Sequence, residues 1–385
     1  MTLSGGASVP RFDPSRLDDQ AYLADGDPSG MLRTVASSAA QIRTAYRAAV
    51  EAGAARVAGQ GRPRALVVAG VGAAGIAGDV LNAVCGPGAP LPIVTVRGYR
   101  LPGWIGAADM VMVLSFTGRG DEALALGAEA VRRGCSLLAA GPADTPLSAL
   151  AAQAGAPFVP ISTVAGQPAA TMWGLAVPLL VAASALGLTD AGEPVFEAAA
   201  QRLEDIAHRC RPASDSFINP GKTLAMELAD GIPMIWGTAP IAAVAAHRLA
   251  AQLAEQAGCP AVWGALPEAA HDQAGVLDGP LAARDIFEDF GDDEASGPRA
   301  RVRLFLLRDA DEHPEVAERR QTSLRLAQDR GVPVSEIASE GAHPFERLAA
   351  LVGLGDFAAA YLALGYGLDP APMSVIAELR ARVSQ

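Results

Sequence analysis

The sequence predicts an α/β protein with doubly wound, mainly parallel sheets, an arrangement that is used twice along the chain. Three observations support this fold class. Apolar runs of strand length alternate with segments of helical spacing in the first half of the chain. A second alternation of the same kind begins at residue 234. Between the first run and the first helix, the glycines and alanines of residues 70–75 are typical of a tight strand-to-helix turn.

In the first half, five apolar runs are predicted to form one parallel sheet, because helical segments separate them. The predicted strands are residues 65–69, 92–97, 110–115, 136–140 and 157–160. The predicted helices are residues 31–53, a segment that ends near residue 84, residues 121–133, a short helix between residues 140 and 157, and residues 175–188. Residues 1–30 are rich in Gly, Pro and Asp and are predicted to be an irregular lead-in, followed by a first domain over residues 31–190.

The second half, residues 191–385, is predicted to be a second domain that ends in C-terminal helices. Its predicted strands are residues 234–236, 260–264, 301–307 and 332–338. Its predicted helices are residues 193–208, 240–257, 316–330, 344–365 and 372–383. Residues 285–299 are acidic and contain glycines, so an exposed loop is expected there.

Composition excludes several classes of protein. At 385 residues, half of them hydrophobic and 19% charged, the chain has enough apolar side chains for two ordinary cores. The formal net charge of −12 argues against nucleic-acid and anionic-membrane partners. Residues 175–188 are apolar but contain Pro178 and are too short to cross a bilayer. The four cysteines match no metal-ligand spacing, and no signal peptide is recognisable, so reduced thiols in a cytoplasmic protein are expected.

The first turn is the strongest candidate for a binding site. A strand, a small-residue turn and a helix N-terminus present backbone N–H groups that favour a phosphate. Gly70, Gly72 and Gly75 also match the G-x-G-x-x-G pattern of dinucleotide-binding folds. The second strand ends in Arg97, where an NAD site would have an acidic residue, although an arginine would suit NADP. An NADP-dependent oxidoreductase is therefore one of the alternatives.

A second turn follows the third strand, in the sequence SFTGRGDEAL. Ser115 and Thr117 are either hydroxyl donors to a phosphate or ordinary capping residues before the next helix. Because two adjacent strand ends both suit phosphate, a small phosphorylated ligand in the crevice above the sheet is the favoured interpretation.

Two candidates for acid–base chemistry lie in the second half. Arg248, Gln252 and Glu255 share one face of the predicted helix 240–257, which makes them either a solvent-exposed polar stripe or part of a site. His271, flanked by Glu268 and Asp272, is either a general acid–base group or a loop residue.

Several stretches together resemble the SIS (sugar isomerase) domains of bifunctional phosphoglucose/phosphomannose isomerases. These stretches are GVGAAGIAGD, RGYRLPGW, SFTGRGDE, HRLAAQLAEQA, LPEAAHD and LGDFAAAYLALGYGLDPAP, and they run in order over residues 30–385. The resemblance implies two SIS-type αβα sandwiches with flavodoxin-like sheets. It also implies an aldose–ketose isomerase that works through a cis-enediol without metal or cofactor.

The resemblance further implies roles for individual residues. Glu255 would be the base that moves a proton between C1 and C2 of the sugar. His271 would help to open the sugar ring and would come from the other subunit, so a homodimer with shared sites is implied. Gly70, Gly72, Ser115 and Thr117 would hold the phosphate. Arg119, Arg248 and Arg380 are further candidates for substrate and phosphate binding.

The chain departs from the family pattern at several of these places. Ala74 and Gly120 stand where the family has a phosphate-binding Ser and Thr, and Ala169 stands where it has an Arg that stabilises the enediolate. Asp272 replaces an Asn, and Arg380 replaces a Lys. These departures define a second interpretation, in which a non-catalytic SIS protein binds a sugar phosphate or nucleotide sugar and regulates carbohydrate metabolism.

Overall fold

The computed structural model describes residues 10–162, 171–282 and 301–371, together with Val375, Glu378, Leu379 and Arg382. The predicted acidic loop, most of the predicted helix 372–383, and the candidate positions Ala169 and Arg380 lie outside the described residues.

The first half is built on a five-stranded parallel sheet with the strand order β2-β1-β3-β4-β5. This is the flavodoxin-like order, so the predicted fold class is confirmed. Each predicted strand is present within two residues of its expected bounds. The strands are β1 (Leu66–Ala69), β2 (Ile93–Val96), β3 (Met110–Leu114), β4 (Ser136–Gly141) and β5 (Phe158–Pro160).

Alternate residues of the central strands face opposite helical layers, as the two-residue period of a strand requires. Leu66 and Val68 of β1 belong to the core beneath α4 and α7, whereas Val67 and Ala69 belong to the core beneath α5 and α6. Because helices cover both faces, β1 and β3 are buried along their whole length. The helices involved are α4 (Ala73–Cys85), α5 (Asp121–Arg132), α6 (Pro146–Gln153) and α7 (Met172–Ala185).

The lead-in is more regular than the sequence predicts. It contains a 3₁₀ turn, η1 (Pro14–Leu17), and a helix, α1 (Gln20–Gly26), which Asp13 and Asp19 cap with their side chains. The predicted helix 31–53 is two helices, α2 (Met31–Ala36) and α3 (Ser38–Glu51), and a further 3₁₀ segment, η2 (Ala54–Gln60), follows them.

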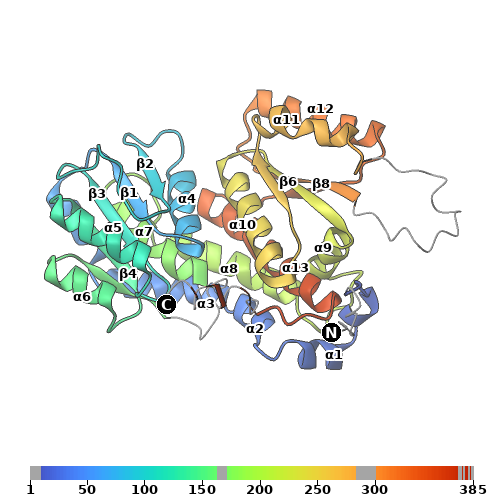
Figure 1. Ribbon diagram of the computed structural model, residues 1–385, viewed down its shortest axis with the longest axis horizontal. Coiled ribbons are helices and arrows are strands. Elements are labelled where there is room, and N and C mark those ends of the chain that lie inside the picture. Colours follow the sequence, from blue (N-terminus) through green and yellow to red (C-terminus); the bar gives the residue numbers. More distant parts are fainter. Residues whose placement is uncertain are drawn as a thin grey trace, which may run out of the picture.

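The second half repeats the architecture with a four-stranded parallel sheet in the order β7-β6-β8-β9. Its strands are β6 (Gly231–Gly237), β7 (Val262–Ala265), β8 (Arg301–Arg308) and β9 (Val334–Ala338). Its helical segments are α8 (Glu193–Arg209), α9 (Pro220–Leu228), α10 (Pro240–Ala257), α11 (Ala269–Asp272), η4 (Ala274–Asp278), α12 (Pro314–Asp329) and α13 (Pro344–Gly365). Figure 1 shows the two sheets side by side, with α4 and α10 facing each other between them.

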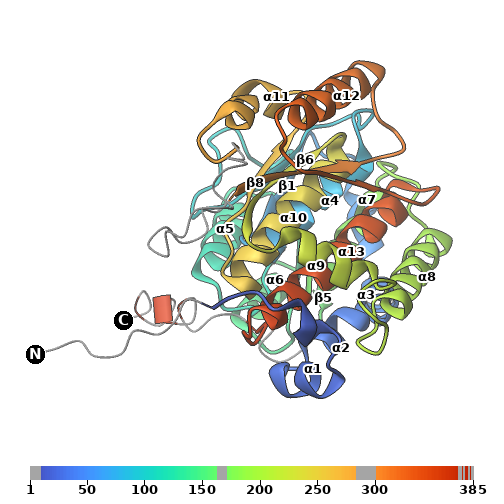
Figure 2. The ribbon, with the colours of Figure 1, turned by 90° about the vertical axis from the view of Figure 1, so that its right-hand side faces the viewer.

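One hydrophobic core runs through both halves. It contains side chains from α3, α4 and α7 of the first half and from α8, α10 and α13 of the second. Among the described helices, α13 is the one long and apolar enough to cross a membrane by length and composition, but 89% of its most apolar window is buried inside the protein. Figure 2 shows α13 surrounded by α8, α9 and α10, so it is the central core helix.

Candidate functional site

The glycine turn (residues 70–72) joins β1 to α4 and has the predicted geometry. Gly72 caps α4 with φ of 57°, a left-handed value that favours glycine. At Gly70, an added Cβ would lie 2.7 Å from the Cβ of Ala74, so positions 70 and 74 both require small residues. The backbone therefore approaches the start of α4 closely, as a phosphate-binding turn requires.

The hydroxyl turn (residues 115–120) follows β3, at the same edge of the sheet. Ser115 is buried, and its Oγ accepts a hydrogen bond of 3.0 Å from the N–H of Gly118. The Oγ1 of Thr117 accepts one of 3.2 Å from the N–H of Arg119. The cap of α5 is Gly120, which has no side chain, so neither hydroxyl caps that helix. Both hydroxyls thus stabilise the turn in which they lie. Thr117 and Arg119 are exposed at the tip of this turn.

Arg97, the residue that suited NADP, is bound to α4. It donates a hydrogen bond of 3.1 Å to the carbonyl of Gly75 and forms an ion pair with Asp79. The guanidinium is therefore already paired with groups of α4. This favours the sugar-phosphate interpretation over the NADP interpretation, in which Arg97 would bind the cofactor.

Arg248 lies in the protein core, which corrects its assignment to the substrate. Its side chain is 3% exposed, and its Nε and Nη2 donate hydrogen bonds of 3.0 and 2.9 Å to the two carboxylate oxygens of Asp356. Gln252 donates to the same carboxylate at 3.3 Å and is also buried. The alternative of a solvent-exposed stripe is therefore wrong as well, because two of its three members join α10 to α13.

Glu255 and His271 lie at opposite edges of the second sheet within one chain. α10 starts after the carboxyl end of β6 and ends before the amino end of β7, so Glu255, two residues before the end of α10, lies near the amino edge. His271 is in α11, which follows the carboxyl end of β7. Its ring is exposed, with Nε2 3.4 Å from Nη1 of Arg319. One chain does not bring this pair together.

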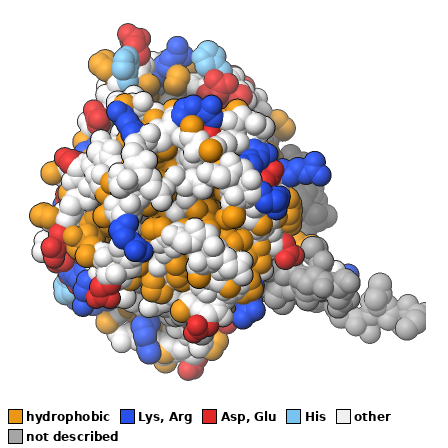
Figure 3. All heavy atoms as spheres, turned by 90° about the vertical axis from the view of Figure 1, so that its left-hand side faces the viewer, with side chains coloured by type: hydrophobic (Ala, Val, Ile, Leu, Met, Phe, Trp, Pro, Cys, Tyr) orange, Lys and Arg blue, Asp and Glu red, His pale blue; other side chains and the backbone are white. Residues whose placement is uncertain are grey.

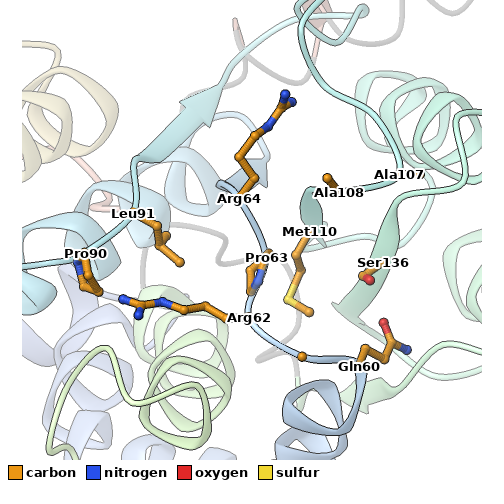
Figure 4. A pocket seen from close by; sticks show the side chains of 11 residues that line it. Gln60, Arg62, Pro63, Arg64, Pro90, Leu91, Ala107, Ala108, Met110 and Ser136 are labelled. Carbon is orange, nitrogen blue, oxygen red and sulfur yellow. The ribbon is translucent and has the colours of Figure 1, made fainter.

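The structure has a cavity of about 510 Å³ at the amino edge of the first sheet. Figure 4 shows its lining, which includes Arg62 and the first residues of β3 and β4, Met110 and Ser136. The predicted crevice is at the carboxyl edge, where the glycine and hydroxyl turns lie. This cavity is therefore a separate feature.

Two structurally important carboxylates were not predicted. Asp356 carries a signal in the sequence, because it is the single charged residue in the apolar stretch 348–365, and such a residue indicates a buried partner. Asp79 carries none that identifies its contacts, since its partners are Thr95 on β2, Arg97 directly after β2 and His247 on α10. On the face of the molecule in Figure 3, basic and acidic side chains are interspersed rather than gathered into a basic surface.

Comparison with known proteins supplies independent information. Residues 217–383 match the bacterial phospho-glucose isomerase C-terminal SIS domain. A bifunctional phosphoglucose/phosphomannose isomerase of Caldicellulosiruptor bescii is 26% identical over 321 residues, which cover 83% of this chain and 89% of that protein. A protein of the same name from Aquifex aeolicus is 24% identical over 294 residues, 76% of this chain and 82% of that protein.

Solved structures show the same fold at low sequence identity. A hypothetical protein of Thermus thermophilus has a TM-score of 0.70 at 12% identity, covering 96% of this chain and 94% of that one. The tagatose-6-phosphate ketose/aldose isomerase of Escherichia coli has a TM-score of 0.61 at 14% identity, covering 93% of this chain and 98% of that one.

Proposed function

We propose that the chain is a divergent member of the SIS-domain bifunctional phosphoglucose/phosphomannose isomerase family, which the comparisons support, and that it interconverts glucose 6-phosphate or mannose 6-phosphate with fructose 6-phosphate. The observation that carries the proposal is a similarity to a protein of that name over 83% of the chain, across both halves. We further propose that the protein acts as a homodimer in the cytoplasm.

The chemistry needs a base, a phosphate site and donors for the developing oxyanion. Glu255 takes the proton from C2 of the open-chain aldose and returns it to C1, while the hydroxyl proton of C2 passes to O1, so that atoms and charge balance. The N–H groups of the glycine turn, at the start of α4, hold the phosphate. The hydroxyl turn lies at the adjacent strand end, with the guanidinium of Arg119 at its tip.

The positions of Glu255 and His271 support the proposal of a site shared between two chains. Since they lie at opposite edges of the second sheet, a site containing both is assembled from two chains. In a dimer with twofold symmetry, each site then contains the Glu255 of one chain and the His271 of its partner.

A second function is supported by the departures from the family. Ala74 is buried against Gly70 and provides no hydroxyl, and Gly120 provides none either. A site with fewer phosphate donors suits a protein that binds a sugar phosphate without converting it. Losing one charge-assisted hydrogen bond weakens binding by about 1–3 kcal/mol, which still permits binding.

The test that separates the two functions is turnover of fructose 6-phosphate, with glucose 6-phosphate and mannose 6-phosphate measured separately. We expect Glu255→Gln to lower kcat by about 10²–10⁴-fold, because it removes the base while keeping the size of the side chain. Glu51→Gln, an exposed position on α3, is the matched control and should retain full activity. Binding of fructose 6-phosphate without turnover by the folded wild-type protein would establish the non-catalytic function instead.

The shared site has its own test. Glu255→Gln and His271→Asn are each expected to be nearly inactive, and a co-expressed mixture should recover about a quarter of wild-type activity. Half of the dimers in a random mixture are mixed, and one of their two sites has both residues intact. A mixture that stays as inactive as its parents would place Glu255 and His271 of the same chain in one site.

A further inference from the structure

Asp79 joins the two halves of the molecule through a single carboxylate. Its Oδ2 lies 3.5 Å from Nδ1 of His247 on α10. The same oxygen accepts a hydrogen bond from the guanidinium of Arg97. Its Oδ1 accepts a hydrogen bond of 3.2 Å from the hydroxyl of Thr95 on β2. The Asp79 and His247 side chains are 26% and 27% exposed, so both are largely enclosed at the seam between the halves.

His247 is held from its other side as well. Its ring stacks on that of Trp263, with 4.5 Å between centroids and 18° between planes. Trp263 is the second residue of β7, so the imidazole is fixed between α4 of the first half and β7 of the second. On the first half, the hydrogen bond from Arg97 to the carbonyl of Gly75 ties the same carboxylate to the first turn of α4. The contact therefore has a defined geometry on both sides.

The two helices in this contact are those that carry the proposed phosphate site and the proposed base. Asp79 follows Gly72 by seven positions on α4, about 10 Å along the axis. His247 precedes Glu255 by eight positions on α10, about 12 Å along the axis. Figure 1 shows α4 and α10 side by side. A shift between these helices would change the distance from the phosphate turn to Glu255.

We propose that Asp79 and His247 are positioning residues that hold Glu255 at a fixed place relative to the phosphate bound at the glycine turn. This inference rests on the proposed isomerase function. Neither residue touches the sugar. They act by keeping the base aligned with C1 and C2 when the phosphate is anchored, and a misplacement of about 1 Å in such a geometry costs on the order of 10²-fold in rate.

The test uses Asp79→Ala, His247→Ala and the double variant. Each single variant should lower kcat by at least about tenfold while KM for fructose 6-phosphate changes by less than about threefold, because the phosphate turn is intact. The double variant should be about as slow as either single variant, because both lose one contact. A purely stabilising role would lower the melting temperature without this separation of kcat from KM.

Glu204→Ala is the matched control. Glu204 on α8 pairs with Arg43 on α3, which also joins the two halves but involves neither α4 nor α10. It should leave kcat and KM unchanged. A kcat within about twofold of wild type in Asp79→Ala, or losses that multiply in the double variant, would overturn the proposal.

Hydrogen exchange separates this proposal from the isomerase assignment, because it does not depend on turnover. Asp79→Ala should speed amide exchange in both α4 and α10, whereas Glu204→Ala should not. A wild-type protein without turnover would refute the isomerase assignment, while unchanged exchange in Asp79→Ala would refute the contact as a link between the two helices.

Discussion

Arg248 and Asp356 form the most completely buried ion pair of the described interface between α10 and α13. Both side chains are less than 5% exposed, and the pairing is bidentate. A charge in such a place is stable only while its partner and its hydrogen bonds remain. The pair therefore orients α10, and with it Glu255, against the central core helix.

Arg248→Met should lower the free energy of unfolding by about 3–5 kcal/mol, because it leaves the carboxylate of Asp356 buried without its cationic partner. The double variant Arg248→Met with Asp356→Leu should be closer to wild type, since no charge is then buried. Urea unfolding measures both values. Arg43→Met, which breaks ion pairs of a more exposed arginine, should cost less, and an equal loss for the two arginines would contradict the argument.

At the scale of single residues, the sequence predicted which positions stand at the strand ends but not which partners they have. Gly70 and Gly72 were predicted because a strand and a helix flank them. The burial of Arg248 depends on its ion pair with Asp356, which lies 108 residues away in the sequence. Helical spacing contains no information about such a contact.

At the scale of elements, the strands were predictable because apolar runs between helices specify a buried parallel sheet. The helix α9 was not predicted. Its start, Asn219-Pro220-Gly221, has the composition of a turn. In the structure, the side chain of Asn219 accepts hydrogen bonds from the N–H groups of Gly221 and Lys222, and Pro220 occupies the first helical position. The same residues thus begin a helix once the apolar face that follows has a core to pack against.

The break between α2 and α3 was also missed. No Gly or Pro marks it, and the change of direction occurs at Ser37, whose ψ is near 0°. The hydroxyl of Ser37 donates to the carbonyl of Thr34, and that of Ser38 donates to the carbonyl of Val35. Serine hydroxyls that compete for helical carbonyls in this way favour a local break, which the apolar periodicity does not reveal.

At the scale of the whole molecule, arginine–carboxylate pairs connect distant parts of the chain and make stability depend on pH. Hydrogen bonds from arginines are the largest cause that lowers the pKa of four described carboxyl groups below the usual 3.8 for Asp and 4.5 for Glu. These groups are Asp109 beside Arg64, Glu197 and Glu204 beside Arg43, and Asp278 beside Arg330. A pKa lower in the folded than in the unfolded protein means that the unfolded chain binds more protons in acid.

The urea midpoint should therefore be constant near neutral pH and fall as the pH drops below about 4.5, through the lowered pKa values of the folded state. Asp109→Asn should be less stable at neutral pH and should lose part of this acid dependence, because Asp109 is fully buried and paired with Arg64. Measurements at pH 7 and pH 3.5 provide the comparison. A variant with the full acid dependence of wild type would exclude Asp109 as a contributor.

The two sheets, with orders β2-β1-β3-β4-β5 and β7-β6-β8-β9, place corresponding helices against each other. In each half, the helix after the first strand, α4 or α10, packs on its counterpart. A tight glycine precedes both helices, since a Cβ at Gly70 would come within 2.7 Å of the Cβ of Ala74 and one at Gly237 within 2.2 Å of the backbone of Ala243. The helix α10, however, begins with Pro240, which has no N–H to offer an anion. Of the two equivalent turns, the one before α4 therefore has more backbone N–H groups available for an anion.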